Sequence, residues 1–157
     1  MPCITAILHT HNDASRIARA VKSLRPCDEV LLIDHDSSDD TCQVASAFGA
    51  RVMAALPNTH ESSWMDQAAN DWILCVRPTE AVSEALEASL LEWKLNDAVA
   101  QTLYGVSILE ETMDGWISHP AEARLVHRKH MHGDGRTPVA GGTLYALDGY
   151  LTRLRLP

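Results

Sequence analysis

The sequence contains no apolar run that approaches the roughly 18 residues a membrane-spanning helix needs. Residues 1–10 also lack the basic start, the long apolar stretch and the small-residue cleavage site of a secretory signal. We therefore expect a protein without a transmembrane segment that resides in the cytoplasm. The length of 157 residues and the 46% content of hydrophobic residues are typical of one globular domain, residues 1–157, with a single core.

Positive charge is scarce in the chain. Its 13 Lys and Arg residues stand against 21 Asp and Glu residues, which gives a formal net charge of −8. Proteins that bind nucleic-acid backbones depend on clustered Lys and Arg, so this balance argues against a nucleic-acid partner. Paired cysteines are also missing. Cys3, Cys27, Cys42 and Cys75 contain no C-x-x-C spacing, which argues against zinc or redox sites and favours buried free thiols.

Strand-length apolar runs alternate with amphipathic helical patterns over the first part of the chain. The apolar runs lie at 3–10, 30–33, 50–55 and 71–76, and the helical patterns at 13–24, 41–49, 63–70 and 83–95. This alternation predicts an α/β fold, a Rossmann-like three-layer α/β/α sandwich with a mostly parallel central sheet. Further strands are expected at 99–109 and 123–128, and loops at 110–122 and 131–142. Residues 151–157 fit either a last strand or a tail that packs against another subunit.

Polar side chains follow three of the predicted strands, in the loops HTHND at 9–13, DHDSSDD at 34–40 and RPTE at 77–80. In an open parallel sheet, ligands bind beyond the carboxyl ends of the strands, so these loops are expected to form the site. Acidic residues in the second loop can cap the following helix, but more are present than capping requires. Asp34 ends its strand, and its carboxylate is expected to face the crevice and to accept a hydrogen bond from a base or a ribose.

The order of these motifs resembles the opening of a family 2 glycosyltransferase of the GT-A fold. In that family a strand ending in a T-Y-N-E-like loop precedes a V-D-x-G-S-x-D-x-T-like turn, and G-D-W-I-L leads into the fourth strand. The matching positions are Thr10, Asn12 and Asp13, then Asp34, Ser37, Asp39 and Thr41, then Asp71 to Leu74. The resemblance is closest to the bacterial branch that decorates lipopolysaccharide cores and other cell-surface glycans.

The resemblance implies that the ligand is a nucleotide-diphospho-sugar, a UDP-sugar or one with another nucleotide. It divides the chain into a nucleotide-binding half at 1–95 and a shortened acceptor-side half at 96–157. One of the nucleotide-binding positions, His11, stands where the family often has a tyrosine. The residues that it places around the nucleotide are Thr10, His11, Asn12, Asp34, Ser37 and Asp39.

The loop after the fourth strand departs from the family. Family members carry a D-x-D-like pair there, whose carboxylates hold Mg²⁺ or Mn²⁺ against the donor diphosphate. Aligned on residues 71–74, this chain has Arg77 and Thr79 at the two positions and retains only Glu80. The resemblance therefore implies that no metal cofactor is bound.

The segment that supplies the general base in the family also differs. Its nearest counterpart, residues 135–139, ends without a carboxylate, so Asp134 or Glu122 would have to act as the general base. The candidate catalytic residues are Arg77, Glu80 and Asp134.

Three functions stay open at this stage. The first is a catalytically impaired glycosyltransferase-like protein, a pseudoenzyme that binds a nucleotide or a partner protein. The second is an active, metal-independent glycosyltransferase in which Arg77 holds the diphosphate. The third is a structural or assembly module that forms a homodimer or binds another protein. A separate group of histidines fits either a metal site or a polar surface loop: His119, His127, His130 and His132.

Overall fold

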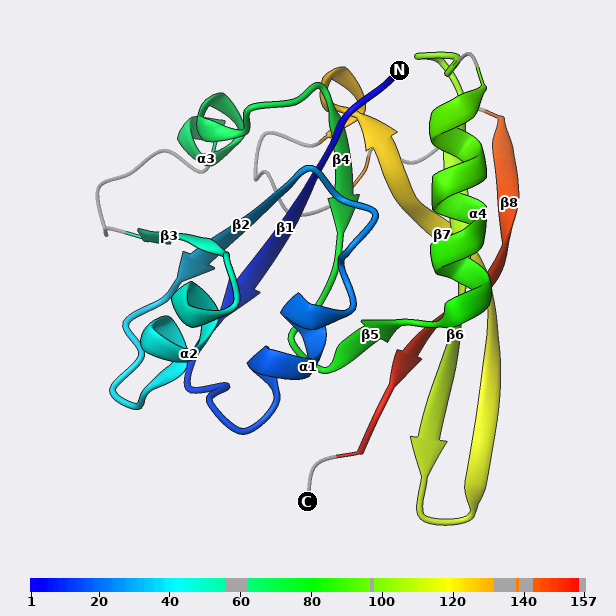
Figure 1. The fold of residues 1–157 in the computed structure, drawn as a ribbon. Helices are drawn as coiled ribbons and strands as arrows, with labels where there is room; N and C mark the ends of the chain where they lie inside the picture. The colour runs from blue at the N-terminus through cyan, green and yellow to red at the C-terminus, as the bar shows by residue number, and fades with distance from the viewer. Residues whose placement is uncertain (56–61, 97, 132–137, 139–142, 156–157) are drawn as a thin grey trace.

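Eight strands form one sheet in the order β3-β2-β1-β4-β7-β6-β8-β5 (Figure 1). The computed structural model describes residues 1–55, 62–96, 98–131, 138 and 143–155. The strands are β1 (Ile4–Thr10), β2 (Glu29–Asp34), β3 (Arg51–Ala54), β4 (Trp72–Cys75), β5 (Glu80–Val82), β6 (Leu103–Thr112), β7 (Gly115–His127) and β8 (Leu144–Arg153). The α-helices are α1 (Ile17–Lys22), α2 (Thr41–Ala47), α3 (Ser62–Gln67) and α4 (Glu84–Leu95), and a short 3-10 helix spans Arg128–His130.

The first half of the sheet is parallel and forms the base of the site. β3, β2, β1 and β4 pair in parallel, with Thr10 of β1 beside Asp34 of β2 and Ile7 of β1 beside Cys75 of β4. Their carboxyl ends therefore lie along one edge, where the three polar loops begin. In the described residues, four of the seven strand pairings are parallel, and the three antiparallel ones are β4–β7, which joins the two halves, and β6–β7 and β5–β8 in the second half.

Helices cover both faces of this parallel half, as the alternation predicted. Successive side chains of a strand point to opposite faces, so Leu8 packs in a core with α1, α2 and α4, whereas Ile7 packs with Trp64 and Met65 of α3. Burial on both faces explains why β1 reads as a continuous apolar run in the sequence. Among the described residues, no helix has the length and apolar character needed to cross a membrane.

The prediction of a loop at 110–122 is wrong. β6 continues to Thr112 and turns directly into β7, and this long hairpin projects beyond the parallel half (Figure 1). Gly115 begins β7 with a φ of 128°, a conformation that side chains disfavour. The outer part of β7 is exposed on both faces, so its sequence shows no apolar alternation that would reveal a strand.

β5 and the start of β8 were also not predicted. β5 pairs with the end of β8, so that Glu80 lies beside Arg153, and β8 crosses close to the start of α4. At this crossing Ser83 caps α4, because its Oγ accepts the N–H of Leu86 (3.1 Å). The same oxygen accepts the N–H of Tyr150 (3.0 Å), which ties β8 to the helix. The strand alternative for residues 151–157 is confirmed as far as Arg153.

Candidate functional site

Asn12 joins the loops that follow β1 and β2. Its backbone N–H donates to Ser37 Oγ (2.9 Å), and its Oδ1 accepts the N–H of Ser38 (2.8 Å). Asn12 adopts a left-handed conformation with φ 51°, which asparagine tolerates better than most residues. The two loops predicted to hold a nucleotide are therefore one hydrogen-bonded unit at the carboxyl edge of the sheet.

Asp34 ends β2 and is partly exposed at this edge. Its carboxylate accepts the hydroxyl (2.5 Å) and the N–H (3.2 Å) of Ser37. The pKa of the Cys42 thiol is raised, chiefly by burial and secondly by its hydrogen bond to Asp34. A carboxylate has about four acceptor positions, so Asp34 keeps capacity for a ligand after these contacts.

Thr10 and Asp13 hold the first loop from beneath. The Thr10 hydroxyl donates to Asp13 Oδ2 (2.6 Å), which also accepts the N–H of His11 (3.0 Å). Arg16 pairs with the other carboxylate oxygen of Asp13 (2.5 Å). Thr10 is 2% exposed, so its side chain shapes the loop and offers no free hydroxyl at the surface.

Asp39 connects the second loop to α2 and to the first loop. It accepts the N–H of Thr41 (3.0 Å) and the N–H of Ala14 (3.2 Å). These hydrogen bonds, with the Thr41 hydroxyl contributing most, lower the pKa of Asp39 from its ordinary value. The predicted nucleotide residues thus lie together at one edge, while their contact with a nucleotide stays a prediction.

A cluster of rings borders this edge on the α3 side. His9 Nδ1 lies 2.9 Å from His35 Nε2, and His11 Nδ1–H donates to the carbonyl oxygen of His35 (2.6 Å). The ring of Trp64, on α3, meets those of His9 and His35 edge-on at centroid distances of 4.9 and 5.6 Å. The sequence did carry a signal for His9: it lies two residues after Ile7, so it shares the face that α3 covers.

The loop after β4 contains a buried carboxylate and an exposed guanidinium. Glu80 is fully buried, and its two oxygens accept Arg124 Nη1 (2.8 Å) and Nη2 (2.9 Å). Arg153 Nη2 (2.9 Å) and the N–H of Arg77 (2.9 Å) also donate to Glu80. Burial alone would raise the pKa of Glu80, but Arg124 outweighs it and the net shift is downward.

This geometry corrects the interpretation of Glu80 as a catalytic or metal-binding remnant. Its carboxylate has no exposed surface and is neutralised by Arg124 and Arg153, so it cannot reach a substrate or an ion. Arg77 is exposed, and the structure shows no ion pair between it and any described residue. Asp134 lies outside the described residues, and Glu122, which is half-exposed, pairs with Arg124 (2.8 Å).

His119 and His127 lie apart from each other. His119 Nε2 lies 2.6 Å from Glu110 on the hairpin, whereas the ring of His127 meets Trp72. Eight residues of extended chain separate these two histidines, which corresponds to about 26 Å. Within the described residues, no three His, Cys, Asp or Glu side chains are placed to hold a metal ion together, and His132 is outside them.

The chain is similar in sequence to bacterial proteins named as glycosyltransferases. An uncharacterised glycosyltransferase of Rickettsia felis is 37% identical over 91 residues, which cover 55% of this chain and 32% of that protein. A second, from Rickettsia prowazekii, is 34% identical over 91 residues, with 55% and 31% covered. The chain thus spans about a third of the length of these relatives. No protein-family model matches it.

Solved structures match the fold more broadly. Staphylococcus aureus TarS, residues 1–349, superposes with a TM-score of 0.53 at 16% identity, over 68% of this chain and 36% of that one. Glucosyl-3-phosphoglycerate synthase from Mycobacterium tuberculosis, in complex with Mn²⁺, UDP and glucosyl-3-phosphoglycerate, superposes with a TM-score of 0.50 at 20% identity, over 66% and 44%.

The fold is therefore that of the GT-A glycosyltransferases, as the motifs predicted. The resemblance to glycosyltransferases is confirmed by the curated relatives, which carry that name.

Proposed function

We propose that this protein is a glycosyltransferase-like domain that binds a nucleoside diphosphate, or its sugar derivative, without a divalent cation and with little or no transfer activity. The observation that carries the proposal is the enclosure of Glu80 by Arg124 and Arg153. Residues 76–80, which follow β4, contain no other carboxylate.

The loops after β1 and β2 support the proposed binding of the nucleoside. Asn12 and Ser37 hold these loops together, and Asp34 keeps acceptor capacity at an accessible edge. A partly exposed carboxylate there can accept hydrogen bonds from ribose hydroxyls or from a base N–H. The uracil base of a uridine nucleotide, or the guanine base of a guanosine nucleotide, would lie beside this edge.

Among the described residues, the segment after β4 offers no accessible carboxylate to a cation. Mg²⁺ and Mn²⁺ favour several oxygen ligands, and in transferases carboxylates of this loop supply them. Here the only carboxylate of residues 76–80 is buried, and the exposed Arg77 would repel a cation. Without a metal ion, a leaving diphosphate is less well neutralised, so transfer is expected to be slow or absent.

A second candidate function is active, metal-independent transfer. The exposed guanidinium of Arg77, with no ion pair to a described residue, is the observation that favours it, because a guanidinium binds phosphate oxygens through two parallel hydrogen bonds. In this case the diphosphate would leave while paired with Arg77.

Calorimetric titration with UDP and GDP tests the proposed role of Asp34 in binding the nucleoside. The titration compares the wild-type protein with Asp34→Asn and with a control in the same loop, Asp36→Asn. The control suits the site because Asp36 is exposed and has φ 60°, which asparagine also adopts. Loss of the Asp34 charge is expected to weaken binding by roughly tenfold, and the Asp36 change by less than about twofold.

Turnover of UDP-glucose and GDP-mannose distinguishes the two candidates. Little or no product supports the impaired protein, whereas turnover that disappears in Arg77→Gln supports the metal-independent enzyme. Absence of binding to every nucleotide tested would contradict both, and would favour a structural or assembly module.

A further inference from the structure

Three segments that are distant in the sequence meet at the backbone carbonyl of Thr79. Arg19 Nη2, from α1, donates to this oxygen (3.1 Å). The N–H of Leu154, just after β8, donates to it as well (3.2 Å). Arg77 begins the turn that contains Thr79, since the N–H of Glu80 donates to the Arg77 carbonyl (2.9 Å), and Arg155 follows Leu154 directly. One turn thus joins the side chain of Arg19 to the backbone beside Arg77 and beside Arg155.

The arginines of this cluster differ in how far they are neutralised. Arg124 and Arg153 share the buried Glu80, and Arg153 Nη1 also lies 3.9 Å from Glu110. Arg155 is exposed and, like Arg77, forms no ion pair with a described residue. Two positive side chains at the turn are therefore uncompensated, in a chain whose formal net charge is −8.

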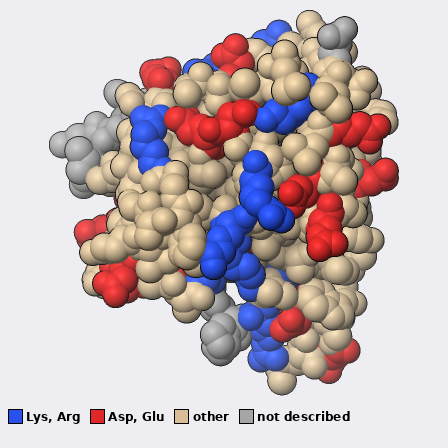
Figure 2. Space-filling model, in the orientation of Figure 1, with Lys and Arg blue, Asp and Glu red and all other residues tan. Residues whose placement is uncertain are grey.

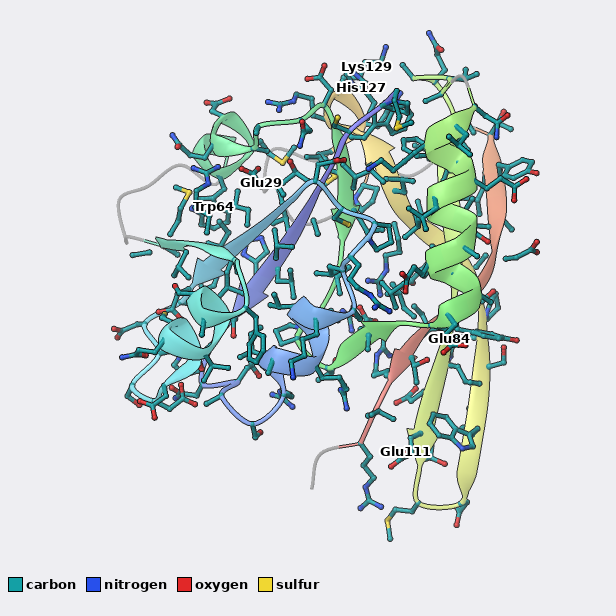
Figure 3. The ribbon with its side chains drawn as sticks, viewed as in Figure 1. Glu29, Trp64, Glu84, Glu111, His127 and Lys129 are labelled. Carbon is teal, nitrogen blue, oxygen red and sulfur yellow. The ribbon has the colours of Figure 1, made fainter. Side chains whose placement is uncertain are left out.

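Arg19 adds a third positive side chain to the turn. The pKa of Arg19 is lowered, chiefly by burial and secondly by the charge of Arg16, while Glu111 on the hairpin acts in the opposite sense (Figure 3). The buried Nε of Arg19 has no hydrogen-bond acceptor in the described part of the chain. Figure 2 shows Lys and Arg side chains gathered in a band over α1 that continues downward beside a hollow in the surface.

The cluster lies within reach of the proposed nucleoside position. Val76 donates its N–H to Ile7 (3.2 Å), so the turn leaves the sheet at the same edge as the loops after β1 and β2. One strand, β1, separates β2 from β4, and the end of β4 beside Ile7 lies three residues short of the end of β2 beside Thr10, so the two ends are about 14 Å apart. A nucleoside diphosphate bound through Asp34 can span that distance with its phosphates.

We propose that Arg19, Arg77 and Arg155 form a metal-independent binding site for the phosphate groups of a nucleoside diphosphate. Guanidinium groups match phosphate oxygens in shape and charge, so they can bind the diphosphate of the ground state without a divalent cation. The assignment of the phosphates to a nucleoside diphosphate rests on the function proposed above. The phosphate chemistry of the cluster can be tested separately with inorganic pyrophosphate.

The test is a calorimetric titration of uridine, UDP and pyrophosphate in EDTA, with the wild-type protein and with Arg77→Gln/Arg155→Gln. Both side chains are exposed, so the double change is expected to leave the fold intact, which circular dichroism checks. Arg25→Gln is the matched control, because Arg25 is 74% exposed and pairs with Glu87 away from the turn.

The wild-type protein is expected to bind UDP at least about a hundredfold more tightly than uridine, and the double variant to lose roughly tenfold of that for each guanidinium removed. Uridine affinity should not change in the double variant, and UDP affinity should not change in Arg25→Gln. Equal affinity for uridine and UDP in the wild-type protein would overturn the arginine site while leaving nucleoside binding intact.

If the proposed nucleotide binding is wrong, the titrations give a different set of results. If neither uridine nor UDP binds, the nucleoside proposal is contradicted, and pyrophosphate then decides the arginine site alone. Pyrophosphate binding that is lost in the double variant supports the site, and absence of pyrophosphate binding to the wild-type protein refutes it.

Discussion

Replacement of Glu80 by glutamine should destabilise the protein far more than the same replacement of Glu122. Both carboxylates pair with Arg124, but Glu80 is fully buried whereas the Glu122 side chain is 52% exposed. Glu80→Gln leaves two guanidinium groups without their buried counter-charge. Removing one partner of a buried ion pair typically costs 3–5 kcal/mol, and we expect about 3 kcal/mol because glutamine can still accept one hydrogen bond. Loss of an exposed pair costs less than about 1 kcal/mol.

Urea unfolding followed by circular dichroism measures this difference. With an m-value of about 2 kcal/mol/M, the Glu80→Gln midpoint should fall by about 1.5 M, and the Glu122→Gln midpoint by less than about 0.5 M. Equal midpoints for the two variants would refute the interpretation of Glu80 as the centre of a buried charge cluster.

The pH dependence gives a second readout for the same variant. Because the pKa of Glu80 is lower in the folded protein, its contribution to stability is complete above the ordinary carboxyl pKa of about 4.3. That contribution is lost as the pH falls through the folded-state pKa. The free energy of unfolding of Glu80→Gln should therefore fall less steeply below about pH 4 than that of the wild-type protein.

Two further predictions concern the backbone and the thiols. Gly149→Ala should lower the free energy of unfolding by about 2 kcal/mol or more, because Gly149 has φ +96° and an added Cβ would lie 2.2 Å from the backbone nitrogen of Leu86. Gly115→Ala, with φ +128° but no atom within 4 Å, should cost only about 1 kcal/mol in the same urea experiment, and equal costs would contradict the role of the close contact. At pH 8, a thiol reagent should label the exposed Cys3 first, because burial raises the pKa of Cys27 to about 12. Mass spectrometry that finds Cys27 labelled as fast as Cys3 in the folded protein would contradict this.

The parallel half of the fold was predictable because its residues obey local patterns. β1 is buried on both faces and so reads as an apolar run, and Asp34 marks the end of β2. The four cysteines are free as expected, but Cys3 is exposed and the other three are only partly buried, so the predicted burial was wrong for Cys3 and holds only in part for the others. The loops after β1 and β2 lie at one edge of the sheet as predicted, because the strands they follow are parallel neighbours, and their contact with a nucleotide stays a prediction.

The parts of the fold and site that were not predicted depend on contacts between residues that are distant in the sequence. Glu80 looked like the remnant of a metal site because nothing nearby indicates Arg124 and Arg153, which lie 44 and 73 residues further on. The outer part of β7 was missed because both of its faces are exposed, and residues such as Gly115 and Pro120 are typical of loops. The proposed site at Arg19, Arg77 and Arg155 was likewise not predictable, because their segments come together only when β8 returns beside β5.

The central claim is that this domain binds a nucleoside diphosphate without a divalent cation. Calorimetric titration of UDP in EDTA and then in excess Mn²⁺ tests it most directly. The proposed site predicts the same dissociation constant in both conditions, within about threefold, because arginines supply the positive charge. A dissociation constant that falls tenfold or more when Mn²⁺ is added would contradict the claim and would mean that carboxylates elsewhere in the protein hold the metal ion.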